Sequence, residues 1–191
     1  MSVSGVSAYL VAQDSVKNTF VIARGNLECD FTIQEHKIKD ENKDGVYELS
    51  DEEVYGNTYS VYPGVDIPKD PFIRLKELKC NSYMYVEVVD SGDGQGYEWD
   101  VNDNWLETSL EGTKGGKVYV YKGDSDNAVV LDIDTGYDLE VFILEGIDSN
   151  GNGGVRIKDD YSSDGLKLEF YGYLIEARDS NDYEVTFNSS L

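Results

Sequence analysis

The chain has 191 residues, 40% of them hydrophobic, and its 16 lysines and arginines are outnumbered by 38 aspartates and glutamates, giving a net charge of −22. A surface this acidic repels phosphate backbones and anionic membrane surfaces, so nucleic acid is not expected as a partner. No stretch approaches the ~18 consecutive apolar residues that a transmembrane helix needs, which predicts no membrane span. The length suits one compact domain with its own core.

The first feature along the chain is an apolar run, 8–12, that has no turn residues around it and no obvious partner strand. No hydrophobic signal region precedes it, and we interpret 1–7 as an expression start placed where a removed signal peptide would have ended. From Leu27 onward the chain alternates apolar and polar residues, which is typical of a half-buried strand. The apolar members are Leu27, Cys29, Phe31 and Ile33.

Period-two alternation recurs along the rest of the chain, and the segments between the alternating runs are rich in Gly, Asn, Asp and Ser. Short strands joined by polar turns, without a strand–helix–strand rhythm, favour an all-β fold. We therefore predict an antiparallel β-sandwich that is jelly-roll-like. Further strands are predicted at 72–78, 82–90, 117–121, 128–133, 137–144, 166–177 and 183–187.

Helix is expected to be scarce and limited to one or two short helices in loops. The first candidate is 50–54, where Ser50 could cap a helix and Glu53 occupies the capping-box position. The second candidate is 104–110.

The segment 40–51 has the oxygen-ligand spacing of a calcium-binding loop. Gly45 supplies the sharp turn at position six, and Asp51 stands at position twelve, where a bidentate Glu is usual. Alternate oxygen ligands on a tight turn are what a hard cation needs, so we predict a structural Ca²⁺ site here. Its ligands would be Asp40, Asn42, Asp44, Val46 through its carbonyl group, Glu48 and Asp51.

A second segment, 148–159, follows the same scheme with fewer charges, which predicts weaker calcium binding. Its ligands would be Asp148, Asn150, Asn152 and Asp159. For both segments the alternative is a solvated turn, because Asn, Asp and Gly form such turns readily without metal.

Two cysteines, Cys29 and Cys80, lie far apart and outside any CxxC pattern, which excludes a zinc ribbon and a thioredoxin-type motif. They could form one disulfide. The favoured alternative is two small buried side chains on separate strands, because an even number of cysteines does not prove pairing.

Catalytic patterns are scarce in this sequence. His36 is the only histidine, which excludes a two-histidine zinc site, and its place at the polar end of a strand predicts an ordinary surface residue. The chain has no G-x-S-x-G motif, and 112–118 (GTKGGKV) lacks the spacing of a phosphate-binding loop. Trp99 and Trp105 could stack on a sugar, although a core position is the more common one for tryptophan. We therefore expect no enzyme.

The N-terminal part of the chain resembles the mature start of the TasA and camelysin family, which are secreted bacterial proteins processed by a dedicated signal peptidase. Two later segments, 62–88 and 166–177, resemble further stretches of that family in the same order, and together the three cover about half of the chain. The matching N-terminal residues are Ala8, Tyr9, Leu10, Asn18, Thr19, Phe20, Ile22, Gly25 and Leu27.

The resemblance implies a jelly-roll-like sandwich that is secreted to the bacterial cell surface and assembles into biofilm-matrix fibres. In TasA-like fibres the N-terminal segment of one subunit completes a sheet of its neighbour. This implies a donor strand within an extended segment, 1–17, ahead of a single sandwich domain at 18–191. Head-to-tail donation of strands without closure gives an open filament. The donor-strand residues would be Ala8, Tyr9, Leu10, Val11, Ala12 and Val16.

We therefore expect an extracellular structural protein, a subunit of a biofilm-matrix or pilus-like fibre, in which Ca²⁺ could screen the charge of −22. Self-association is the expected interaction, and matrix or cell-surface components are the other expected partners. One alternative is a secreted metal-dependent protease of the camelysin type. Another is a calcium-containing carbohydrate-binding or adhesion module, which predicts aromatic side chains exposed together on one sheet face.

Overall fold

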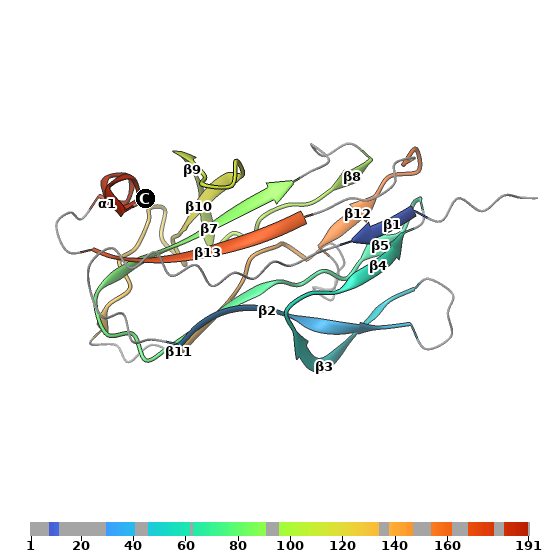
Figure 1. The fold of residues 1–191 in the computed structure, drawn as a ribbon, viewed down its shortest axis with the longest axis horizontal. Coiled ribbons are helices and arrows are strands. Elements are labelled where there is room, and N and C mark those ends of the chain that lie inside the picture. Colours follow the sequence, from blue (N-terminus) through green and yellow to red (C-terminus); the bar gives the residue numbers. More distant parts are fainter. Residues whose placement is uncertain are drawn as a thin grey trace, which may run out of the picture.

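A computed structural model of the protein describes residues 8–11, 30–40, 46–61, 63–90, 96–133, 138–146, 154–161, 168–177 and 182–190. All strand pairings among these residues are antiparallel. Two four-stranded sheets form the two layers of a sandwich (Figure 1). The predicted all-β antiparallel sandwich is thereby confirmed, whereas this strand order does not establish a jelly-roll connectivity.

The first large sheet has the order β13–β7–β10–β9, and the second has the order β11–β6–β2–β3. The first comprises β13 (Leu168–Glu176), β7 (Ser82–Asp90), β10 (Lys117–Tyr121) and β9 (Trp105–Glu111). The second comprises β11 (Asp138–Phe142), β6 (Phe72–Lys76), β2 (Asp30–Lys39) and β3 (Glu48–Val54).

Two smaller sheets lie at one end of the sandwich, on the right of Figure 1. One is a two-stranded ribbon of β1 (Ala8–Val11) and β4 (Thr58–Val61). The other has the order β5–β12–β8 and comprises β5 (Asp66–Ile67), β12 (Val155–Ile157) and β8 (Tyr97–Glu98).

The main core lies between the two large sheets. Phe31 and Ile33 of β2 are buried there, as their alternation predicts. Gly172 of β13 lies opposite them, and a β-carbon added to this glycine would come within 2.8 Å of the Phe31 ring. The two layers therefore approach closely at Gly172, where only a residue without a side chain fits.

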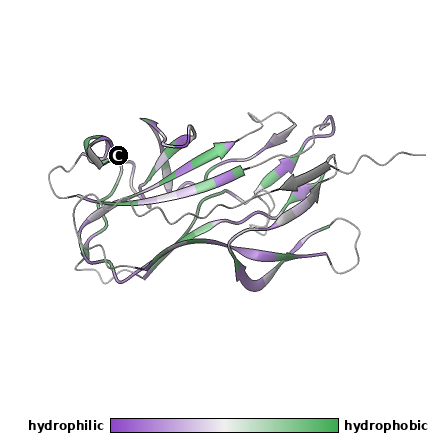
Figure 2. Cartoon of the chain, in the orientation of Figure 1, coloured by the Kyte–Doolittle hydropathy of each residue, from purple (hydrophilic) through white to green (hydrophobic). Residues whose placement is uncertain are grey.

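β7 is buried on both faces, although its alternation predicts a strand with one buried face. Val86 and Val88 join the main core, whereas Tyr85 joins a second apolar cluster on the outer face of the same sheet. The helix α1 (Tyr183–Ser190) packs at this cluster, where Phe187 and Tyr85 place their ring centroids 4.9 Å apart. Figure 2 shows apolar residues along β7, in contrast to the largely hydrophilic β3 at the rim.

Two segments that we predict as helices are strands in the structure. The segment 50–54 belongs to β3, and 104–110 falls largely within β9. Leu106 and Leu110 are four residues apart, a spacing that suits a helix, but Thr108 between them is also half-buried. Pairing of β9 with β10 therefore selects the strand.

Conversely, 183–187 is predicted as a strand and is helical. The Asp182 carboxylate caps this helix, accepting hydrogen bonds from the backbone N–H groups of Glu184 (2.9 Å) and Val185 (3.2 Å). No helix among the described residues is long and apolar enough to cross a membrane. The predicted strand at 128–133 is also wrong, since the described residues there form only a bridge between Leu131 and Ser82.

Candidate functional site

The N-terminal strand β1 pairs with β4 of its own chain. The four pairs of opposed residues are Ala8 with Val61, Tyr9 with Ser60, Leu10 with Tyr59, and Val11 with Thr58. This corrects the expectation that the apolar N-terminal segment has no partner strand within its own chain. With four residues, β4 is too short to show a clear alternation of apolar and polar residues in the sequence. Ala12 and Val16, the other two expected donor residues, lie outside the described residues.

The β1–β4 ribbon is attached to the rest of the molecule through β4. Among the described elements, β1 makes extensive contact with β4 alone, and β4 forms strand hydrogen bonds with no other described strand. A two-stranded ribbon is marginally stable by itself in water. β4 must therefore gain its fixed position from side-chain contacts with the sandwich.

The first such contact is made by Tyr59 of β4. This residue is fully buried, and its hydroxyl group donates a hydrogen bond to the carbonyl oxygen of Pro68 (3.3 Å). The Lys69 ammonium lies 5.9 Å from the centroid of the Tyr59 ring. Tyr59 thus joins β4 to the segment that precedes β6.

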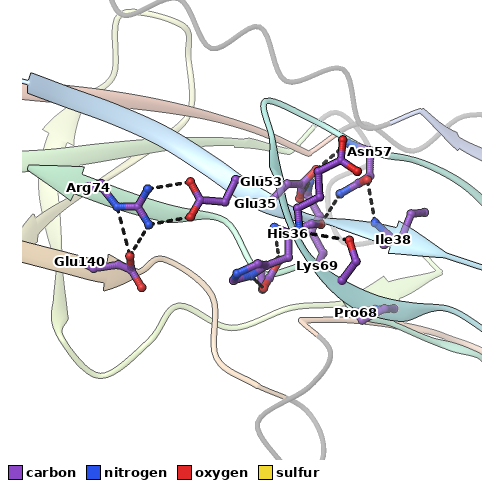
Figure 3. A network of polar contacts seen from close by, with 12 residues as sticks. Glu35, His36, Ile38, Glu53, Asn57, Pro68, Lys69, Arg74 and Glu140 are labelled. Carbon is purple, nitrogen blue, oxygen red and sulfur yellow. Dashed lines mark hydrogen bonds and ion pairs between the residues drawn. The ribbon is translucent and has the colours of Figure 1, made fainter.

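Lys69 also forms an ion pair with Glu35 of β2, and neither side chain is exposed to solvent. The Lys69 Nζ donates to Glu35 Oε2 at 2.9 Å, and the backbone N–H of Asn57 donates to Glu35 Oε1 at 2.6 Å (Figure 3). A buried charge pair of this kind is retained only with good geometry and additional hydrogen bonds. Asn57 immediately precedes β4, so Glu35 links the start of β4 to β2.

The side chain of Asn57 makes a second connection to β2. Its amide group donates to the His36 carbonyl oxygen (2.8 Å) and accepts from the Ile38 backbone N–H (3.1 Å). The register between β2 and β3 shifts between His36 and Ile38, and the Asn57 amide supplies hydrogen-bond partners at that irregularity. We refer to Glu35, Asn57, Tyr59 and Lys69 as the β4 anchor.

A second pair of hydrogen-bonded side chains lies beside the β4 anchor. His36 Nδ1 and Asp70 Oδ2 are 2.7 Å apart, and the His36 backbone N–H donates to Asp70 Oδ1 at 3.1 Å. The prediction of His36 as an ordinary surface residue is therefore wrong, since its side chain is only 30% exposed and its ring packs on Phe72. Burial raises the pKa of Asp70, and the hydrogen bonds from His36 partly oppose this rise.

Arg74 joins three strands on the outer face of the second sheet. Its guanidinium binds both carboxylate oxygens of Glu53 in β3 (2.7 and 2.8 Å) and one oxygen of Glu140 in β11 (2.6 Å) (Figure 3). This fork geometry is specific to arginine. The hydrogen bonds from Arg74 lower the pKa of Glu53, which the sequence placed at a helix-capping position.

The loop 112–116, which lacks the pattern of a phosphate site, is held by a buried carboxylate instead. Glu87 of β7 is fully buried. Its Oε1 accepts hydrogen bonds from the backbone N–H groups of Lys114 and Gly116 (both 2.8 Å), and its Oε2 accepts one from the Tyr173 hydroxyl (2.7 Å). Glu87 therefore stabilises the β9–β10 turn from within the sheet.

The first candidate calcium loop connects β2 to β3. Val46 is 62% exposed, and Glu48 and Asp51 are exposed residues of β3. Asp40 directly follows β2, whereas Asn42 and Asp44 lie outside the described residues. Within the part of the chain that the structure describes, no three acidic, histidine or cysteine side chains gather as a metal site.

The second candidate calcium loop precedes and includes β12. Asp159 is exposed in the turn after β12, with its carboxylate beside Gly64. The other expected ligands, Asp148, Asn150 and Asn152, lie outside the described residues. Calcium binding by either loop stays a prediction.

Of the two cysteines, Cys80 is half-buried before β7 and packs against the main core. Cys29 lies outside the described residues, and the disulfide stays a prediction. The tryptophans are engaged internally: the Trp105 indole N–H donates to the Phe142 carbonyl oxygen (2.9 Å), and that of Trp99 donates to Asp90 (2.9 Å). Trp105 is buried and Trp99 is half-buried.

No family model, curated protein or solved structure matches this chain.

Proposed function

We propose that the protein is a structural subunit of an extracellular fibre of the biofilm-matrix or pilus-like kind, in which β1 of one copy pairs with β4 of the next. The observation that supports this best is the β1–β4 ribbon. Because β1 has β4 as its one extensive contact among the described elements, a β1 from another copy could replace it without disturbing the sandwich.

Exchange of β1 between copies would form the same backbone hydrogen bonds that exist within one chain. Such exchange of an identical element lets subunits associate at a low cost in free energy. It yields an open filament when the contact runs head to tail. In the unassembled monomer, β1 would then pair with β4 of its own chain. In the fibre, β1 would pair with β4 of the neighbouring subunit.

Charge sets the conditions for assembly. Each subunit carries a net charge of −22, so close stacking requires cations or enough salt to screen the repulsion. At physiological ionic strength the screening length is about 8 Å. Ca²⁺ bound at the loops 40–51 and 148–159 would lower the negative charge further, and we propose that it promotes fibre formation.

A truncation series tests this function. We compare the full chain with a form that lacks 1–7, which leaves β1 intact, and a form that lacks 1–17, which removes it. Each is analysed by size-exclusion chromatography and negative-stain microscopy, with calcium and with chelator. The full chain and the shorter truncation are expected to form fibres, because both retain β1, and the longer truncation is expected to stay monomeric.

Equal polymerisation of the form lacking 1–17 would show that strand donation is wrong. Monomers in every preparation, with calcium included, would contradict the fibre role itself. A casein digestion assay with and without chelator tests the protease alternative, and we expect no digestion in either case.

A further inference from the structure

The two partners in the β1–β4 ribbon are held very differently. β1 makes extensive contact with β4 alone among the described elements. β4 is preceded by Asn57, which bonds to β2 through both its backbone and its side chain, and it contains Tyr59, which is fully buried against the Lys69 segment. Among the described elements, β1 is therefore held chiefly through β4, whereas β4 is held by contacts outside the ribbon.

The fixed position of β4 depends on directional contacts. Glu35 accepts the Asn57 N–H at 2.6 Å with one oxygen and the Lys69 ammonium at 2.9 Å with the other. Lys69 lies near two aromatic rings, at 5.9 Å from the Tyr59 centroid and 5.5 Å from that of Phe170 in β13. Lys69 thus fixes the position of the Glu35 carboxylate, and that carboxylate fixes the position of Asn57, the residue before β4.

Stability alone does not explain why charges are used here. Replacing a buried ion pair by apolar side chains of similar volume is often neutral or stabilising, so the core would not require Glu35 and Lys69. A polar cluster instead specifies position, because its hydrogen bonds are satisfied in only one arrangement.

We propose that the β4 anchor, formed by Glu35, Asn57, Tyr59 and Lys69, holds β4 in place as a preformed acceptor strand. Substitutions in the anchor would therefore disable the acceptor strand of a subunit and leave its donor strand, β1, intact. This inference rests on the proposed fibre function and adds to it the residues that make the acceptor. A subunit with a damaged anchor still donates its own β1 but cannot receive the β1 of another copy. It therefore ends a growing filament.

The test uses two anchor variants and one control in the full chain. The first variant is Asn57→Ala, which removes the side-chain bonds to β2. The second is Glu35→Leu with Lys69→Met, which removes both charges together. The control is Lys37→Gln with Glu52→Gln, an exposed ion pair between β2 and β3, with side chains 48% and 61% exposed.

Circular dichroism confirms that each variant is folded, and hydrogen exchange of the 58–61 amides then reports how firmly β4 is held. We expect faster exchange at 58–61 in both anchor variants than in wild type and the control. Each pure anchor variant should form no fibres. Mixed into wild type as one subunit in ten, it should limit filaments to about ten subunits on average, because each incorporated copy blocks one end.

Three results separate the explanations. Folded anchor variants that polymerise like wild type, or that leave exchange at 58–61 unchanged, would overturn the anchor proposal while leaving strand donation intact. Equal fibre formation by wild type and the form lacking 1–17 would instead overturn the proposed function. If the double substitution does not fold, Asn57→Ala alone decides, since it leaves the buried charge pair in place.

Discussion

Glu35 and Lys69 lie 2.9 Å apart with neither side chain exposed, so each is the charge that compensates for the burial of the other. The two residues are 34 positions apart in the sequence, and their contact connects β2 to the segment before β6.

Lys69→Met alone should lower the free energy of unfolding by about 3–5 kcal/mol, because it leaves the Glu35 carboxylate buried without a counter-charge. Lys69→Met with Glu35→Leu should be considerably more stable than the single variant. Urea unfolding at neutral pH measures both. Equal stabilities of the single and double variants would contradict the compensation. As a control, Lys37→Gln at the exposed pair should cost less than about 1 kcal/mol.

Gly172→Ala should destabilise the sandwich by about 1–3 kcal/mol, as overpacking does, since the new methyl group would lie within 2.8 Å of the Phe31 ring. Combining it with Phe31→Leu should recover part of the loss, because the smaller side chain makes room. Thermal unfolding of the two single variants and the double variant gives the coupling. Strictly additive losses would show that the two layers do not meet at this point.

The stability contributed by Asp70 should fall as the pH rises. Burial raises the pKa of Asp70 above its ordinary value of 3.8, so the folded protein holds this proton more tightly than the unfolded chain does. The stabilising effect is complete below 3.8 and is lost as the pH rises through the raised pKa. Urea unfolding between about pH 3 and pH 6 should show wild type losing stability relative to Asp70→Asn.

Glu53 provides the contrast for that measurement. The hydrogen bonds from Arg74 lower the pKa of Glu53 below its ordinary value of 4.5, so its contribution is present above that value and is lost as the pH falls. Relative to Glu53→Gln, wild type should therefore gain stability with rising pH. If the stability differences for Asp70→Asn and Glu53→Gln changed in the same direction with pH, at least one of the two assignments would be wrong.

Cysteines placed at opposed positions of the ribbon should detect pairing between copies. Tyr9 and Ser60 are opposed in the antiparallel register, at a separation that suits a disulfide. Tyr9→Cys and Ser60→Cys are made in separate chains that also carry Cys29→Ser and Cys80→Ser. Mixed and oxidised, they should give covalent heterodimers only if β1 of one copy reaches β4 of another. As a control, Ser125→Cys in the turn after β10 replaces Ser60→Cys. Equal yields of heterodimer with Ser60→Cys and Ser125→Cys would contradict the exchange of β1 between copies.

Calcium should raise the melting temperature if either loop binds it, because a ligand that binds only the folded state stabilises that state. We expect a rise in millimolar calcium that is smaller in Asp44→Asn and smaller still when Asp148→Asn is added. Magnesium at the same concentration controls for screening. No shift with calcium would remove both loops as metal sites.

The long strands could be predicted from the sequence because their alternation extends over many residues. β7 matches its predicted bounds, and β13 lies within the predicted 166–177. The shortest elements could not be predicted: β4 has four residues, and 183–187 has apolar residues at a spacing of two, yet Asp182 caps it as a helix.

The candidate site was predicted only in part. The apolar run at 8–12 pointed to the extended β1, but its partner β4 and the β4 anchor depend on contacts between residues far apart in the sequence. Glu35 and Lys69 look like ordinary surface charges in their local sequences, as does His36 beside Asp70. Only the folding of β2 against the 68–70 segment brings these groups together and buries the Glu35–Lys69 pair.

The connection of Asn57 to the His36 carbonyl and the Ile38 N–H determines how the molecule would carry mechanical load. In a fibre, tension on the β1 of a neighbouring subunit would act parallel to β4. The hydrogen bonds between the two strands would then be loaded in shear and would resist the force together. Asn57 and Glu35 would pass that force to β2, a ten-residue strand paired on both sides. The subunit would therefore yield first at the exchangeable ribbon, while its sandwich stays folded and ready to rejoin the fibre.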